Sequence, residues 1–172
     1  MLNPSSRLGW PGAAQGQQQP ALPEDPTASC TFTFVDAQYV RDYRGSKLPF
    51  FQELRAKHPE KLIEVKLTYA EVVSGQHVEE TLSVSHRWMK PDQPDPDGEQ
   101  LKAIQAFLRS PEGQKIKRVW IDAQSMPQDQ PKGSRSAEDT AAFKTMLASV
   151  NMLYLGTSVL VLLDLSYVSR FW

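Results

Sequence analysis

The sequence predicts an α/β fold, a flavodoxin-like parallel sheet with flanking helices behind a disordered amino-terminal tail. Three observations support this prediction. Strand-like and helix-like patterns alternate from residue 81 onward, which is typical of parallel strands joined by right-handed crossovers. The run 159–163 is continuously apolar, which is typical of a parallel strand covered on both faces. Polar segments follow the strands, at the carboxyl ends where such sheets bind ligands.

The first segment, residues 1–29, is predicted to be disordered. It contains Gln17-Gln18-Gln19 and is rich in proline and glycine. Such a segment cannot bury enough apolar surface to offset the backbone entropy lost on ordering. We therefore treat 1–29 as a Pro/Gln-rich tail, residues 30–80 as an α/β preamble of unclear role, and residues 81–172 as the recognisable domain.

Three elements are predicted in the preamble. Residues 31–35 alternate between apolar and polar side chains, as a strand does. Pro49 precedes a short helix that ends near His58, and the alternation resumes over 62–67. These residues carry no recognisable chemistry, so their role stays open.

The domain begins with a strand over 81–86 and a turn rich in proline and aspartate. Asp97 lies where a helix N-cap is expected, and an apolar stripe follows it at helical spacing. The helix should end near 111–113, before a second strand over 117–122. The stripe residues are Leu101, Ile104, Phe107 and Leu108.

A long polar connection, 123–135, follows the second strand, and loops of this length usually bind something or move. Ser136 and Asp139 form a capping box that opens another helix. Gly156 is the expected end of that helix, and the strand 159–163 comes next. The predicted stripe of this helix consists of Phe143, Met146, Leu147, Val150 and Leu153.

Charge and cysteine content narrow the possible partners. The 172 residues carry 19 Lys plus Arg and 20 Asp plus Glu, a net charge of −1 that argues against nucleic-acid and membrane partners. Cys30 is the single cysteine, so no internal disulfide forms, and a cytoplasmic location is expected. No signal peptide is visible, and the longest apolar window, 153–163, is too short for a membrane span. The histidines and Cys30 show no metal-ligand spacing.

The strand ends carry the candidate binding residues Ser85, His86, Arg87, Trp88 and Asp122. An arginine can hold a phosphate or carboxylate in a bidentate manner, and a tryptophan can stack on a base. In the alternative interpretation Trp88 fills the core and Arg87 pairs with a carboxylate of the following turn. His86 and Asp122 would meet at the ends of adjacent strands, as an acid/base pair, or Asp122 would cap nearby backbone N–H groups.

These residues resemble a known family. Ser85-His86-Arg87-Trp88 and Trp120-Ile121-Asp122-Ala123, followed by Met126-Pro127-Gln128-Asp129, are similar to the heterokaryon-incompatibility (HET) domain and the related TIR domain. The HET pattern reads Ser-Tyr-x-Trp-Gly at the first strand and Trp-Ile-Asp-Ala-x-Cys-Ile-Asn-Gln at the second. The segment 162–172 resembles the Ser-x-Trp element of TIR domains. The chain departs from the HET pattern at His86, Met89, Ser125 and Pro127.

The resemblance implies a signalling module of the cell-death or innate-immune type. Enzymatic TIR domains cleave NAD, as a substrate, with a glutamate on the helix after the Ser-x-Trp element. That position lies beyond Trp172, so no catalytic residue is assigned. The resemblance further implies a nucleotide pocket lined by Arg87 and Trp88. The segment 123–135 would gate this pocket or mediate assembly, with itself or with other TIR/HET-like domains, through Met126, Gln128 and Asp129.

Two alternatives stay open beside the NAD interpretation. The same surface would serve a non-enzymatic module for homotypic contacts, or the chain would be a gene-model fragment without activity. In the flavodoxin-like strand order 2-1-3-4-5, a missing carboxyl-terminal part would leave 159–163 as an unpaired apolar edge unless residues 31–67 covered it. We therefore expect the fold to be incomplete at its carboxyl end, so that the natural protein continues past Trp172 or needs a partner.

Overall fold

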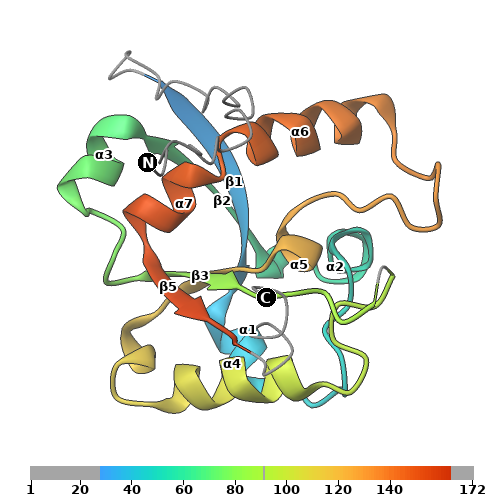
Figure 1. The fold of residues 1–172 in the computed structure, drawn as a ribbon, viewed down its shortest axis with the longest axis horizontal. Helices are drawn as coiled ribbons and strands as arrows, with labels where there is room; N and C mark the ends of the chain where they lie inside the picture. Colours follow the sequence, from blue (N-terminus) through green and yellow to red (C-terminus); the bar gives the residue numbers. More distant parts are fainter. Residues whose placement is uncertain (1–27, 91, 164–172) are drawn as a thin grey trace, which may run out of the picture.

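The computed structural model describes residues 28–90 and 92–163 (Figure 1). The predicted tail, apart from its last two residues, and the Ser-x-Trp-like segment from Asp164 onward lie outside the described residues. The strands are β1 (Ser29–Asp36), β2 (Leu62–Thr68), β3 (Thr81–Ser85), β4 (Arg118–Trp120) and β5 (Ser158–Val161). The α-helices are α1 (Ala37–Asp42), α2 (Phe51–Lys57), α3 (Tyr69–Ser74), α4 (Glu99–Arg109), α5 (Asp122–Ser125), α6 (Ala137–Ala148) and α7 (Asn151–Gly156), with 3₁₀ turns η1 (Pro59–Lys61) and η2 (Gly113–Lys115).

All five strands form one sheet in the order β2-β1-β4-β3-β5. β3 pairs in parallel with both β4 and β5, which confirms the α/β class and the parallel arrangement predicted for the strands after residue 80. β1 is antiparallel to both of its neighbours, β2 and β4. The sheet is therefore mixed, with a parallel half that carries the polar strand ends and an antiparallel half beside it.

Residues 30–80 complete this sheet. β1 pairs with β4 through Val35 and Val119, so residues 30–80 share one sheet with the strands after residue 80. The long β1–β2 pairing, from Ser29 opposite Thr68 to Val35 opposite Leu62, forms the far side of the sheet. These strands lie at the opposite end from β5 and do not cover it.

Helices cover both faces of the sheet, and each face has its own apolar core (Figure 1). On one face α1 and α4 pack against Leu82, Val84 and Val119, whose side chains are almost fully buried. On the other face α3, α6 and α7 pack around Phe32 and Phe34 of β1. This two-sided burial explains why consecutive residues of β3 and β1 are inaccessible. Among the described residues, no helix has the length and apolar character needed to cross a membrane.

Of the two predicted helix caps, the one at Ser136 is confirmed and the one at Asp97 is wrong. Ser136 caps α6 by accepting a hydrogen bond from the Asp139 backbone N–H at 3.1 Å, as predicted. Asp97 does not cap α4: Gly98 occupies the N-cap position in the left-handed region, with φ 71°. The carboxylate of Asp95 accepts from the N–H groups of Gln100 and Leu101 instead. A carboxylate farther back in the turn reaches these amides because the chain folds back at Gly98.

The predicted long helix after Ser136 is divided into α6 and α7, with Ser149 and Val150 between them. The division turns the apolar stripe, so Met146 and Leu153 are buried whereas Leu147 is half exposed. Gly156 ends α7, as predicted.

β5 differs from its predicted environment. It pairs with β3 on one side and is the last strand of the described sheet on the other. Val159 and Val161 are 40% and 53% exposed, so this strand is covered on one face and not on both. The apolar run could not reveal this, because its composition says nothing about which elements lie beside it.

Candidate functional site

The carboxyl ends of β3 and β4 bring together the residues that the sequence singled out. His86 follows β3 and Asp122 follows β4, and their side chains meet: His86 Nε2 donates to Asp122 Oδ1 at 3.0 Å. The indole N–H of Trp88 donates to the other carboxylate oxygen at 2.7 Å. We call His86, Trp88, Gln100 and Asp122 the Asp122 cluster. The pairing of His86 with Asp122 follows from the adjacency of two parallel strands.

His86 is held between two hydrogen-bond acceptors. Its Nδ1 lies 2.6 Å from Gln100 Oε1, and the Gln100 amide nitrogen donates to the carbonyl of Arg87, which fixes the orientation of the amide. Both ring nitrogens therefore act as donors, which requires the doubly protonated imidazolium. Burial alone would lower the pKa of His86, but the hydrogen bond and negative charge of Asp122 outweigh burial and raise it. In its protonated form, which these contacts favour, the ring is a buried cation paired with a carboxylate.

Asp122 has little capacity left for a ligand. Besides His86 and Trp88, its carboxylate accepts from the backbone N–H of Ala123 at 2.6 Å, the capping role that the sequence left open. Its backbone carbonyl accepts from the Gln128 amide at 3.1 Å. An acid or base in catalysis must exchange its proton with a substrate, whereas this carboxylate is occupied by three donors of its own chain. The arrangement is suited to fixing two strand ends and the segment that follows.

Ser85 and Arg87 flank His86 in the chain, and their side chains lie in different environments. Ser85 lies near Tyr154 of α7. Burial and the nearby charge of Asp122 raise the pKa of that tyrosine, and Ser85 acts in the opposite direction. Arg87 lines an open groove outside the sheet. The five predicted binding residues are therefore neighbours, but they do not line one common cavity.

The segment after β4 is less open than its polar composition suggested. Its first residues form the short helix α5, and Met126 and Gln128 are only 5% and 7% exposed. Gln128 donates to the carbonyl of Met126, so its side chain satisfies the backbone of its own segment. Asp129 accepts from the N–H groups of Gly133 and Arg135. This burial is at odds with the expectation that Met126 and Gln128 present their side chains to another molecule.

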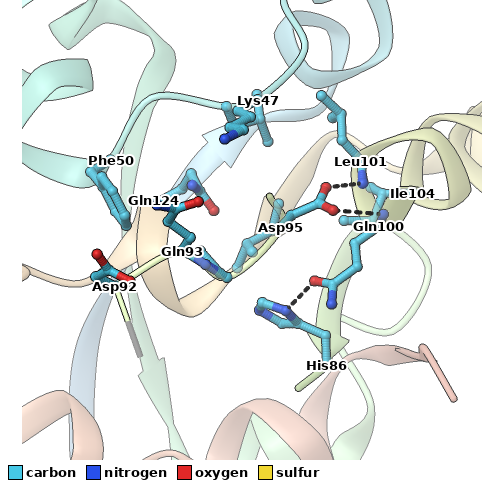
Figure 2. Close-up of a pocket in the computed structure, with 13 residues that line it drawn as sticks. Lys47, Phe50, His86, Asp92, Gln93, Asp95, Gln100, Leu101, Ile104 and Gln124 are labelled. Atoms are coloured by element: carbon cyan, nitrogen blue, oxygen red, sulfur yellow. Dashed lines mark hydrogen bonds between the residues drawn. The ribbon is translucent and has the colours of Figure 1, made fainter. Parts of the chain in front are cut away.

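A small pocket opens beside the Asp122 cluster (Figure 2). It has a free volume of about 90 Å³, below the few hundred Å³ typical of sites for drug-sized ligands. Its walls come from the segment before α2, the turn before α4, α4 itself and α5. The side chains around it include Lys47, Phe50, His86, Asp95, Gln100 and Gln124.

Gln100 and Gln124 are the site residues that sequence reasoning missed as binding groups. The sequence places Gln100 at the start of a predicted helix and Gln124 in a polar connection, and neither position predicts a binding role. A glutamine has no distinctive spacing, and its role depends on where the chain places its amide. The one available signal was the position of Gln124 two residues after Asp122, at the carboxyl end of a parallel strand.

A wider groove of about 500 Å³ lies between the segment after β3, the start of α4 and the end of β5. Arg87 lines this groove together with three acidic residues, Asp95, Asp97 and Glu99. Its apolar side is formed by Met89, Pro96, Ala103, Val161, Leu162 and Leu163.

Within residues 28–90 and 92–163 no group of three or more His, Cys, Asp or Glu side chains is placed to hold a metal ion. Comparison of the chain with protein-family models, with curated proteins and with solved structures finds no match.

Proposed function

We propose that this protein is a TIR/HET-like interaction module without enzymatic activity that assembles with a second copy of itself through the edge strand β5. The observation that carries the proposal is the exposed apolar face of this strand. Val159 and Val161 are 40% and 53% exposed, and Leu163, directly after the strand, is 74% exposed. Monomeric proteins rarely leave a continuous apolar stripe on an open sheet edge, because such an edge pairs with other chains.

Within the part of the chain that the structure describes, backbone groups of β5 at this edge have no hydrogen-bond partner. Leu162 donates its N–H to the carbonyl of Ser85 in β3 at 2.9 Å. Because N–H groups alternate in direction along a strand, those of Val159 and Val161 point away from β3. Leu160 and Leu162 pack against the core on the α4 side, so the valine side chains alternate to the other face of the strand, while Val161 also borders the groove beside α4. A further strand at this edge would pair these amides and cover the two valines together.

The occupant that fits this edge is a second copy of the same strand. In a two-fold interface residue i of one copy meets residue j of the other and residue j meets residue i, so a strand that carries one sign of charge would be repelled by its own copy. β5 reads Ser-Val-Leu-Val and contains no charge. The opposite edge strand, β2, carries the exposed charges Glu64 and Lys66, which are typical of edges protected from association.

The strand order supports the TIR/HET-like part of the proposal. The three parallel strands lie in the order β4-β3-β5, which is the 2-1-3 start of a flavodoxin-like sheet. The three hydrogen bonds that the Asp122 carboxylate already accepts favour a structural role for these strand ends over catalysis. The module would then signal by assembly, as the homotypic interpretation requires.

Analytical ultracentrifugation of the full chain tests the proposal. We expect a reversible dimer whose fraction rises with concentration in the micromolar range. Val161→Lys places a charge opposite itself in the dimer and should give a monomer at the same concentrations. Val73→Lys is the matched control, since Val73 is 74% exposed on the helix α3 and contributes no backbone group to the sheet edge, and it should leave the dimer intact. A monomeric wild-type chain, or equal effects of the two substitutions, would contradict the proposal.

NAD binding or hydrolysis is the second candidate, and the groove beside Arg87 favours it. The groove lies where β3 and β5 diverge to their connections, the point at which doubly wound sheets bind ligands. The negative charges of Asp95, Asp97 and Glu99 would repel the pyrophosphate of NAD in this groove, so this function ranks second. Nicotinamide release from NAD that is lost in Arg87→Ala would support it, and assembly without any release would support the first proposal.

A further inference from the structure

We propose that the pocket beside α5 binds a small uncharged molecule that carries an amide group, and that the side chain of Gln124 is the group that recognises it. This inference does not depend on assembly through β5, because the pocket and that edge use different residues.

Gln124 is an unpartnered polar side chain in an almost fully buried position. The residue is 5% exposed, and among the residues that the structure describes its side-chain amide makes no hydrogen bond. Its backbone is fixed, since its N–H donates to the carbonyl of Ile121 at 3.0 Å. Its amide atoms are not among the fully buried, unpartnered side-chain atoms of the described residues, so they are reached from the pocket and can hydrogen-bond a molecule bound there. Figure 2 shows the Gln124 amide on the wall of the pocket.

The other polar groups deep in the pocket already have partners. His86 is held by Gln100 and Asp122, and the carboxylate of Asp95 is held by the backbone N–H groups at the start of α4. Gln124 is thus the group with free hydrogen-bonding capacity inside, and it faces apolar walls that include Phe50 and Ile104. The mouth carries one exposed cation, Lys47, and one exposed anion, Asp92, so it favours neither sign of charge.

These features define the chemistry of the ligand. A primary amide has a donor and an acceptor side by side, and it pairs best with a second amide that presents the same two groups in reverse order. No unpaired charge lies deep in the described part of the pocket, so an ion would lose its hydration without compensation. The free volume of about 90 Å³ limits the ligand to a few heavy atoms, so a compact amide would fit inside and a five-membered lactam would fill the pocket and extend into its open mouth.

The probe for the test is 2-pyrrolidinone, a five-membered lactam, titrated into the ¹⁵N-labelled full chain and followed by NMR. Cyclopentanone is the matched ligand control, because it has the same ring and carbonyl but no N–H donor. We expect saturable shifts of the Gln124 side-chain NH₂ resonances with 2-pyrrolidinone and binding about tenfold weaker with cyclopentanone. Direct observation of the wild-type side chain makes this arm independent of any substitution.

Gln124→Met is the variant arm, since methionine keeps the length of the side chain and removes both hydrogen-bonding groups. It should weaken binding of 2-pyrrolidinone by about tenfold while the backbone spectrum outside the pocket stays unchanged. Gln93→Met, at the exposed rim of the pocket, is the control and should bind like the wild type. The proposal is overturned if 2-pyrrolidinone causes no saturable shift, if cyclopentanone binds equally well, or if a folded Gln124→Met binds as tightly as the wild type.

Discussion

Removal of the Asp122 carboxylate is the perturbation with the clearest consequence for the fold. Asp122→Ala leaves three donors without their acceptor: the His86 ring, the Trp88 indole and the Ala123 backbone N–H. The His86 side chain is 5% exposed, and the Asp122 side chain is 28% exposed. The substitution therefore strands a buried cation at the junction of β3 and β4 and does more than delete a surface charge.

The magnitude follows from the kind of interaction that is broken. Loss of one partner from a buried ion pair costs about 3–5 kcal/mol, and each buried donor left unsatisfied costs about 1–3 kcal/mol. Both costs include the loss of the His86 contact, so they cannot simply be added, and the partial exposure of Asp122 lowers them further. We therefore expect the free energy of unfolding to fall by about 3 kcal/mol in Asp122→Ala. Asp122→Asn keeps one acceptor oxygen and should lose about half as much.

The same pair makes stability depend on pH. The pKa of His86 is raised in the folded protein above its ordinary value of 6.5, with Asp122, Asp95 and Gln100 as the favourable neighbours. The stabilisation is fully present below the unfolded pKa and is lost as the pH rises through the folded pKa. The wild type should therefore become less stable as the pH rises above about 6.5, and Asp122→Asn should lack most of this decrease.

Urea unfolding followed by tryptophan fluorescence, from about pH 5.5 to about pH 8.5, measures both effects. Asp42→Ala is the control, because Asp42 is exposed and bonds only Gln38, and it should change stability by less than about 0.5 kcal/mol. An Asp122→Ala protein as stable as the control, or an unchanged pH dependence in Asp122→Asn, would refute the role assigned to the ion pair.

Two further predictions concern the helix start and a close contact. Asp95→Ala should lower the free energy of unfolding by about 1 kcal/mol, because α4 loses its cap, whereas Asp97→Ala should be nearly neutral. Equal effects of the two substitutions in urea titrations would contradict the assignment of the cap to Asp95. Gly113→Ala should destabilise by about 1–3 kcal/mol, because a Cβ there would lie 2.0 Å from the Phe107 carbonyl oxygen, and an unchanged melting temperature would contradict this.

Much of the fold could be predicted because the patterns are local. Three predicted strands end within two residues of the strands in the structure: 31–35, 62–67 and 81–86. The helix cap predicted at Ser136 is also present. The pairing of β1 with β4 could not be predicted, because it depends on contacts between distant segments. The exposure of β5 was missed for the same reason: an apolar run reports composition and not its neighbours.

The candidate site was predictable to the extent that it follows from parallel strand ends. His86 and Asp122 were expected to meet, and they do. That Trp88 would donate to the same carboxylate, and that Gln100 would hold the other ring nitrogen, depends on how the turn before α4 folds back. Gln124 is detectable only by its burial and its lack of a partner among the described residues, and neither property is visible in a sequence.

The central claim, assembly through β5, is tested most directly by amide hydrogen exchange of Val159 and Val161 as a function of protein concentration. Their N–H groups point away from β3, so they should exchange rapidly in dilute solution and become protected as the chain self-associates. Leu162, which bonds Ser85, should stay protected throughout as the internal reference. Rapid exchange of both valines under conditions where ultracentrifugation shows a dimer would mean that the chain assembles through another surface.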